Sequence, residues 1–381
     1  MPAVSIDPVA LQRCSQFVGR TTNWLYDHLR HVPRYKPVVY CNKLLNRDEF
    51  PELDAWSVDA RSLTRRLWHR LAGNHLYPTD WWRLRSLASQ VLHSHFGDQA
   101  FEDLQLQKVL GTPWIVAFYG ADVYELGSQA EWQQRYARVF DQAARVLALG
   151  PMMKARLEGL GCPSEKVLIH PLGVDTHKLG SCPRVLQRDE PLKILFAGTF
   201  REKKGIRYLI EAVALLRRRG VQFELHLVGD AGGKPGDLET RDAIFRQIRR
   251  LCLDDFVIHH SYLAFRDLVD LALRLHVFVA PSVTAADGDA EGTPFVLQQM
   301  MATGMAVIAT LHSDIPYIFG QRADLLVPEG NPGAIADHLQ YYAEAPDRLV
   351  DDGTKLRDQA CHFFDIRNCA AHLSDVYDAV R

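Results

Sequence analysis

The residues best suited to chemistry lie in a short acidic loop that leads into an apolar helix. Residues 287–296 read DGDAEGTPFV, and the apolar run continues to Ala302. The first backbone N–H groups of a helix lack partners within the helix and carry the positive end of its dipole. Pro294 suits an early helical position because its ring presets the backbone dihedral. We therefore expect a phosphate to lie against the residues that open the helix: Gly292, Thr293, Pro294, Phe295 and Val296.

Glu291 ends the acidic loop and is not suited to bind a phosphate. A carboxylate beside an anion pocket is better suited to accept hydrogen bonds from the hydroxyls of a sugar. Gln299 follows eight positions later, near the same helix face, and is expected to reach a second set of hydroxyls. From this segment alone, an ordinary surface helix capped by a loop is an equally good interpretation.

Two cations, Arg201 and Lys204, follow a second apolar run that ends in Gly198 and Thr199. Cations in such a loop can neutralise a diphosphate as it becomes a leaving group, so catalysis would not require a metal. The alternative is a solvated charge run ahead of a helix. Aspartates 287 and 289 superficially suggest a calcium loop, but the remaining ligand positions are missing.

These motifs together resemble those of the family-4 retaining glycosyltransferases. The string EGTPFVLQQMMA at 291–302 is similar to the family's helix-opening signature, and ILFAGTFREKKG at 194–205 to its strand and phosphate-clamp loop. Further matches at 225–230, 277–282 and 325–330 follow the family's order, over roughly residues 90–381. The resemblance implies a GT-B architecture, in which two doubly wound, Rossmann-like α/β domains face a cleft. It also implies that Lys204, Arg201 and Glu291 act on a sugar nucleotide without a further cofactor.

The chain departs from the family pattern at three positions. The family commonly has arginine where Thr199 stands, and Arg201 is expected to supply that charge. Gln299 stands where the family has a second glutamate that grips the ribose, and a neutral amide makes a weaker hydrogen bond there. Where the family often has histidine before a glycine, this chain has Tyr119.

We expect Tyr119 and Asp122 on the acceptor side of the cleft, because both follow a predicted strand that ends in a glycine turn. His95 ends another predicted strand and is a candidate to replace the missing histidine. For a single histidine at a strand end, a role in the core or in capping is the more frequent one.

Composition fits an enzyme of two domains. The chain has 381 residues, 47% of them hydrophobic and 24% charged, which is typical of a soluble globular protein. A net charge of −2 argues against nucleic-acid binding. No apolar run reaches the ~18 residues of a membrane span, and the first residues do not resemble a signal peptide. Seven scattered cysteines indicate reduced thiols and a cytoplasmic protein.

Short β-branched runs alternate with amphipathic segments, which predicts strand–helix units around parallel sheets. The predicted strands are 37–41, 91–95, 114–118, 146–149, 167–170, 193–197, 223–228, 256–259, 277–280, 306–310 and 324–327, with helices at 205–219, 240–253 and 360–380. The opening residues lack a clear first strand, and residues 19–21 are only a substitute for its glycine-rich turn. We expect an acceptor domain at 1–180, a linker at 181–191, a donor domain at 192–358 and a helix at 359–381 that returns to the first domain.

Residues 61–85 hold six arginines, one acid and three tryptophans. Such a composition suits the surface of an anionic membrane, where lipid-linked acceptors lie. On this hypothesis the protein binds peripherally at the inner face of the membrane. The more frequent alternative is an arginine-rich helix whose tryptophans pack on the first domain.

The function predicted from these motifs is retaining transfer of a sugar from a UDP- or GDP-sugar to a carbohydrate or lipid-linked acceptor, in polysaccharide or glycolipid assembly. One alternative is a catalytically weak relative that binds nucleotide sugars as a scaffold, which the changes at Thr199, Gln299 and Tyr119 allow. The other is a sugar-nucleotide epimerase, which needs acid and base groups around the sugar. Only Glu291 is clearly placed for that role.

Overall fold

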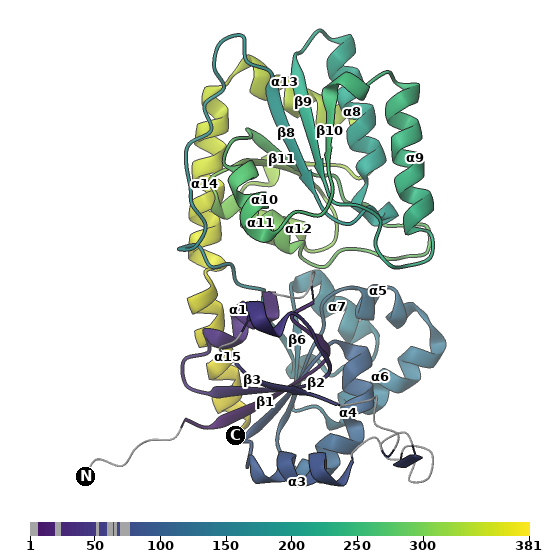
Figure 1. The fold of residues 1–381 in the computed structure, drawn as a ribbon, viewed down its shortest axis with the longest axis vertical. Helices are drawn as coiled ribbons and strands as arrows, with labels where there is room; N and C mark the ends of the chain where they lie inside the picture. The colour runs from purple at the N-terminus through teal and green to yellow at the C-terminus, as the bar shows by residue number, and fades with distance from the viewer. Residues whose placement is uncertain (1–6, 20–23, 51–52, 59–63, 65–66, 69–76) are drawn as a thin grey trace, which may run out of the picture. The chain divides into compact units, whose positions relative to one another are not determined.

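The structure is a computed structural model that describes all residues except 1–6, 20–23, 51–52, 59–63, 65–66 and 69–76 (Figure 1). Residues 20–21 of the substitute turn and much of the arginine-rich segment therefore lie outside the described residues. The chain divides into two compact units. Unit 1 comprises Met1–Gly173 and Ile366–Arg381, and unit 2 comprises Val174–Asp365. Each is a doubly wound, Rossmann-like α/β unit, as predicted.

Unit 1 contains a parallel seven-stranded sheet in the order β3-β2-β1-β4-β5-β6-β7. Its strands are β1 (Val9–Phe17), β2 (Lys36–Leu44), β3 (Asp54–Ser57), β4 (Val91–His95), β5 (Trp114–Ala117), β6 (Arg145–Ala148) and β7 (Val167–Ile169). The helices are α1 (Trp24–Arg30), α3 (Pro78–Ser86), α4 (Gly97–Leu110), α5 (Ala121–Tyr124), α6 (Ala130–Gln142), α7 (Pro151–Gly159) and α15 (Ile366–Val380).

The last helix, α15, completes the core of unit 1 although it is far from the other elements in sequence. Its residues Ala370, Leu373, Val376 and Tyr377 join a buried cluster with Ala10 of β1 and residues of β4, β5 and β6. Tyr377 is fully buried and its hydroxyl hydrogen-bonds to both β1 and β4. The sheet of unit 1 is therefore covered only once α15 is in place.

Unit 2 contains a parallel six-stranded sheet in the order β10-β9-β8-β11-β12-β13. Its strands are β8 (Leu192–Ala197), β9 (Phe223–Val228), β10 (Val257–His260), β11 (Val277–Ala280), β12 (Ala306–Thr310) and β13 (Leu326–Val327). The helices are α8 (Ile206–Arg218), α9 (Asp237–Arg250), α10 (Phe265–Ala272), α11 (Phe295–Ala302), α12 (Ile315–Phe319), α13 (Pro332–Glu344) and α14 (Asp347–Phe363) (Figure 1).

Burial explains why the strands and helices of unit 2 could be predicted from the sequence. Every residue of β11 and β12 is buried, as expected for central parallel strands with helices on both faces. Helix α8 buries Ile206, Leu209, Ile210 and Val213, the spacing of one helix face. Two buried clusters result, one containing α8 and α13 and the other α11 and α14.

The structure differs from the sequence-based expectation in several elements. The predicted single helix at 360–380 is two helices, because α14 ends at Phe363 and α15 begins at Ile366. Strands β1 and β3 were not predicted. Helix α9 begins and ends three residues before the predicted 240–253. Among the described helices, none is both long and apolar enough to cross a bilayer.

Candidate functional site

The predicted donor residues lie in the loops that follow β8 and β11. These two strands are neighbours at the point where the strand order of unit 2 reverses, with β9 on one side and β12 on the other. In doubly wound sheets, ligands bind beyond the carboxyl ends of the strands at this switch point. The fold therefore brings residues 198–204 and 287–296 to the place where a ligand site is expected.

Lys204 and Glu291 form an ion pair with 3.0 Å between Nζ and Oε1. Glu291 is only 8% exposed. Burial alone would raise the pKa of its carboxyl group, but the positive charges of Lys204 and Lys203 outweigh burial and lower this pKa to about 2. Glu291 is therefore a permanent anion at neutral pH, paired with the lysine predicted to face a diphosphate.

A glycine after Lys204 fixes the turn that carries it. Gly205 follows it with a φ of +64°, and a Cβ atom there would lie 1.8 Å from the carbonyl oxygen of Pro281. The turn at Lys204 can thus approach the end of β11 only with glycine at 205. Gly198 lies beside the stem of Lys204, where an added Cβ would be in ordinary van der Waals contact with the lysine Cε at 3.6 Å.

Lys203, the neighbour of Lys204, points into the acidic loop. Its Nζ donates to Asp289 Oδ1 at 2.9 Å and to the carbonyl oxygen of Ala290 at 3.0 Å, and lies 3.9 Å from Glu291 Oε1. Burial favours the neutral amine, but the carboxylates of Glu291 and Asp289 outweigh it and raise the pKa of Lys203. Asp289 is thus engaged by a lysine, which gives it a role other than that of a calcium ligand.

His312 and Glu329 hold the two ends of the same loop. The backbone N–H of Glu291 donates to His312 Nε2 at 3.0 Å, and His312 Nδ1 lies 2.6 Å from Glu329 Oε1. The other carboxylate oxygen of Glu329 accepts from the backbone N–H of Thr284 at 2.9 Å. These contacts connect the loop to the ends of β12 and β13.

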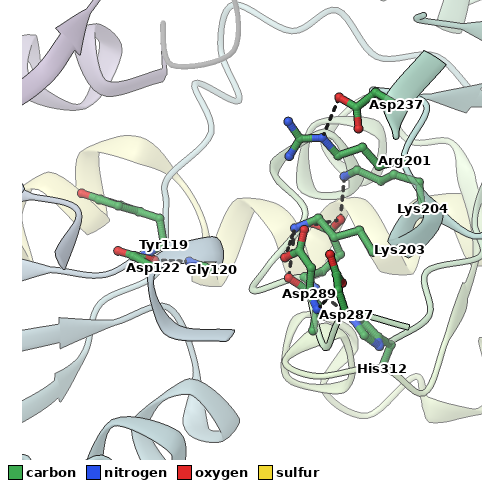
Figure 2. A network of polar contacts seen from close by, with 12 residues as sticks. Tyr119, Gly120, Asp122, Arg201, Lys203, Lys204, Asp237, Asp287, Asp289 and His312 are labelled. Atoms are coloured by element: carbon green, nitrogen blue, oxygen red, sulfur yellow. Dashed lines mark hydrogen bonds and ion pairs between the residues drawn. The ribbon is translucent and has the colours of Figure 1, made fainter. Parts of the chain in front are cut away.

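Arg201 lies beside the same site but has its own partner. Its Nε is 3.5 Å from Asp237 Oδ2 at the start of α9 (Figure 2). A Cβ atom at Gly232 would lie 2.8 Å from the Thr199 side chain and 3.4 Å from Arg201 Nη2. The structure therefore brings Thr199 and Arg201 against the loop after β9, and Arg201 must share its charge with Asp237.

Helix α11 begins next to Glu291, as predicted, but Pro294 stands just before the helix and not within its first turn. Pro294 is the N-cap residue and the helix begins at Phe295. Thr293 is 5% exposed, and its hydroxyl has no hydrogen-bond partner among the described residues. Gln299 is half-buried, whereas Gln298 is fully buried, and neither amide atom of Gln298 has a partner within the described part of the chain.

In unit 1, Asp122 binds backbone groups. Its carboxylate accepts from the N–H groups of Gly97 at 3.0 Å and Tyr119 at 3.0 Å. It also accepts from the N–H group of Gly120 at 2.8 Å (Figure 2). Burial raises the pKa of this carboxyl group to about 6 against the effect of these three donors. Asp122 therefore fixes the turns after β4 and β5, and a direct role toward an acceptor stays a prediction.

Tyr119 and His95 meet in a buried chain of hydrogen bonds. His95 Nε2 donates to Gln12 Oε1 at 3.0 Å, so its Nδ1 accepts from the Tyr119 hydroxyl at 2.6 Å. Gln12 Nε2 donates to the Tyr377 hydroxyl at 3.2 Å, which donates to His93 Nδ1 at 2.8 Å. Both ring nitrogens of His95 are thus engaged within the core, the role that is more frequent for such a histidine.

A small cavity of about 20 Å³ in unit 1 is lined by four histidines, namely His28, His93, His95 and His170. Burial lowers the pKa of His28 to about 4 and of His95 to about 3, and it lowers the pKa values of His93 and His170 well below the ordinary value. All four rings are neutral at pH 7. The described residues contain no group of three or more His, Cys, Asp or Glu side chains placed to hold a metal ion.

Sequence reasoning missed Lys203, His312 and Glu329. Lys203 was counted only as part of a charge run, although a lysine directly before a predicted cation at a strand end was a usable signal. His312 and Glu329 each stand two residues after an observed strand, β12 and β13, at the edge where the other loops meet. Polar residues at the carboxyl ends of successive parallel strands were the signal that could have found them.

Two family models match the chain. The model described as "Glycosyl transferases group 1" matches residues 191–344, and "Glycosyltransferase Family 4" matches residues 20–178. The putative colanic acid biosynthesis glycosyltransferase WcaL of Escherichia coli K12 is 28% identical over 296 residues, which cover 77% of this chain and 71% of WcaL. The amylovoran biosynthesis glycosyltransferase AmsK of Erwinia amylovora is 31% identical over 255 residues. That match covers 66% of this chain and 61% of AmsK, under two thirds of its length.

Solved structures share the fold. Anabaena HepE in complex with UDP and glucose has a TM-score of 0.77 at 14% identity, and covers 98% of this chain and 100% of its own. Sucrose-phosphate synthase from Thermosynechococcus elongatus has a TM-score of 0.78 at 19% identity, with 98% and 99% of the two chains covered. At these identities the likeness concerns the fold alone.

Proposed function

The chain belongs to the group 1, family-4 glycosyltransferases, and from this membership we propose that it transfers a sugar from a nucleoside-diphosphate sugar to an acceptor hydroxyl with retention of anomeric configuration. The C1–O bond to the diphosphate breaks, and a C1–O bond to the acceptor forms on the same face. The acceptor proton passes to an oxygen of the leaving diphosphate. No metal takes part in this proposal.

The observation that carries the proposal is the Lys204–Glu291 pair at the mouth of α11. Lys204 stands 3.0 Å from Glu291, so one small ligand can contact both. Lys204 is proposed to neutralise the charge of the diphosphate. Arg201 and the N–H groups that open α11 are proposed to bind its remaining oxygens. Glu291 is proposed to accept hydrogen bonds from hydroxyls of the donor sugar. The remaining donor residues are Gly198, Thr199, Gly292, Thr293, Pro294, Phe295, Val296 and Gln299.

The electrostatics of Glu291 support a positioning role for its carboxylate. A group with a pKa of about 2 is a weak base at neutral pH and removes a proton from an alcohol poorly. A diphosphate oxygen is the better proton acceptor because negative charge develops there as the bond to C1 breaks. The proposal therefore assigns proton transfer to the substrate and charge stabilisation to the protein.

Donor identity is open to a direct test. We would measure the release of nucleoside diphosphate from UDP-glucose, UDP-galactose, UDP-N-acetylglucosamine and GDP-mannose. The sugar products would be analysed by mass spectrometry, and their anomers by proton NMR. A transferase gives slow release of free sugar with the α-configuration retained from an α-linked donor. An epimerase gives an isomeric sugar nucleotide, and a scaffold gives neither product.

Lys204→Ala is the variant that tests the site. Removal of one fixed charge from a leaving group is expected to lower kcat by about 10²–10³-fold. Arg219→Ala is the matched control, since Arg219 pairs with Asp337 at the surface of unit 2 and is expected to leave kcat unchanged. A Lys204→Ala variant that is folded and fully active would remove the assignment.

The acceptor is proposed to be a growing polysaccharide or its lipid-linked precursor, in line with the names of WcaL and AmsK. Peripheral contact with an anionic membrane is proposed through the arginine-rich segment. In its described part, α3 exposes Trp82 by 69% and Trp81 by 39%, and the Arg85 guanidinium lies 5.0 Å from the Trp81 ring centroid. The exposed indoles suit an interfacial position.

Flotation with phosphatidylglycerol vesicles at low salt tests this contact. The wild-type chain is expected to float with these vesicles and not with phosphatidylcholine vesicles. Trp82→Ala is expected to float less, while the control Trp132→Ala, a change outside α3, floats like the wild type. Absence of binding by the wild-type chain at low salt would remove the membrane proposal.

A further inference from the structure

The loop that carries Glu291 is closed at its base by two side chains, His312 and Glu329, which follow strands β12 and β13. Thr284 begins the loop and Glu291 ends it. The N–H of Thr284 donates to Glu329, and the N–H of Glu291 donates to His312. Because His312 and Glu329 are themselves 2.6 Å apart, one continuous chain of three hydrogen bonds joins the first residue of the loop to the last.

The hydrogen-bond directions fix the tautomer of His312. A backbone N–H can only donate, so Nε2 of His312 must be the acceptor and carry no proton. The ring proton therefore lies on Nδ1 and donates to Glu329 Oε1. Glu329 accepts with both oxygens, one from the imidazole and one from Thr284. His312 is 1% exposed and its bond to the Glu291 N–H is buried, whereas the bond between Thr284 and Glu329 is exposed to solvent.

The interior of the loop is held independently. Lys203 donates to Asp289 and to the carbonyl group of Ala290, and the N–H of Ala285 donates to the carbonyl oxygen of Asp289 at 2.9 Å. A shift of Glu291 relative to Lys204 would therefore break contacts in the middle of the loop and at both ends.

We propose that His312 and Glu329 are positioning residues for Glu291: together they close the loop 284–291 and fix the distance of its carboxylate from Lys204 and the sugar. The catalytic part of this inference rests on the proposed function, because it assumes that Glu291 contacts the donor sugar. Neither residue touches the substrate. A displacement of about 1 Å in a positioned group can lower a rate by ~10²-fold, so loss of this closure lowers turnover.

Two substitutions of His312 separate positioning from bulk. His312→Phe keeps a ring and removes both polar atoms. In His312→Gln the amide oxygen can accept from Glu291 and the amide nitrogen can donate to Glu329. Glu329→Gln has only one acceptor oxygen left for two donors. Tyr342→Phe is the control, because it removes a buried hydrogen bond to Asp352 in unit 2 without touching the loop.

Two readouts are needed. Hydrogen–deuterium exchange of peptides covering 284–291 reports closure of the loop without any substrate. The kcat and KM for nucleoside-diphosphate release from the best donor of the panel above report catalysis. His312→Phe is expected to raise exchange in this loop and lower kcat about 10–100-fold with KM within about threefold. His312→Gln is expected to restore most of both, Glu329→Gln to fall between them, and Tyr342→Phe to match the wild type in both.

Each outcome decides a separate point. Unchanged loop exchange in His312→Phe overturns the closure, whatever the enzyme does. Raised exchange with wild-type kcat overturns the positioning role, and an equal loss of kcat in Tyr342→Phe overturns it as well. If the wild-type chain releases no nucleoside diphosphate from any donor, the proposed function and the catalytic role of the pair both fail. The exchange data then still decide whether the loop is closed.

Discussion

Acid should destabilise unit 1, because its cavity is lined by four neutral histidines. In the unfolded chain these histidines titrate near pH 6.5, whereas in the folded chain burial keeps them unprotonated far below this pH. The unfolded state therefore binds more protons than the folded state below pH 6.5. Stability is full above that pH and is lost as the pH falls toward the folded pKa values.

The size of the effect follows from the same linkage. Between pH 7.5 and 5.5, His28 and His95, whose folded pKa values are about 4 and about 3, together lower the free energy of unfolding by about 3 kcal/mol. The lowered pKa values of His93 and His170 reduce it further. Asp122 acts in the opposite direction, because its pKa is raised to about 6 and the folded state takes up its proton first. This uptake raises the free energy of unfolding by about 1 kcal/mol. The net loss of about 2 kcal/mol or more is a substantial part of the ~5–15 kcal/mol that stabilises a typical domain.

The tryptophans provide an assay for unit 1 alone. All seven lie between residues 24 and 132, so tryptophan fluorescence during urea unfolding reports only this unit. At pH 5.5 the midpoint is expected to lie at least about 1 M lower than at pH 7.5, for a urea dependence of ~2 kcal/mol/M. In His170→Gln the effect of pH on the midpoint should be smaller, because one buried neutral histidine is gone. Equal midpoints at the two pH values would refute the reasoning.

Three further predictions concern unit 2. Gln298→Met is expected to raise the free energy of unfolding by about 1–2 kcal/mol, because it replaces a buried amide without partners among the described residues; thermal unfolding checks it against Gln299→Met, expected near zero. Gln299→Glu should tighten the binding of UDP or GDP severalfold in calorimetry, since a carboxylate makes stronger hydrogen bonds to ribose hydroxyls, and weaker binding would contradict the ribose role. Gly205→Ala should lower the free energy of unfolding by about 3 kcal/mol or more, because its Cβ would lie 1.8 Å from a carbonyl oxygen. A variant as stable as the wild type would show that the turn can relax.

The strands of unit 2 could be predicted because their signal is local. The predicted strands 223–228, 277–280 and 306–310 match the bounds of β9, β11 and β12. These strands are buried apolar runs, and central parallel strands need little else. The motif loops were found for the same reason, since each directly follows such a run.

Strand β1 could not be predicted because its partners are far away in sequence. It buries Gln12 and Arg13 in the centre of the sheet of unit 1. Arg13 pairs with Asp103 at 2.8 Å, and Gln12 hydrogen-bonds to Tyr377 and His95. Polar residues in a central strand look like a surface segment until these partners are known. The loop closure by His312 and Glu329 could not be predicted for a similar reason, because it joins residues up to 45 positions apart.

The placement of α15 affects how the polypeptide matures during synthesis. A ribosome makes residues 1–173 first, yet Tyr377 must reach the sheet before Gln12 and His93 gain their partner. All of unit 2 is translated in the interval. The nascent N-terminal unit therefore keeps part of one face of its sheet uncovered until α15 has been synthesised.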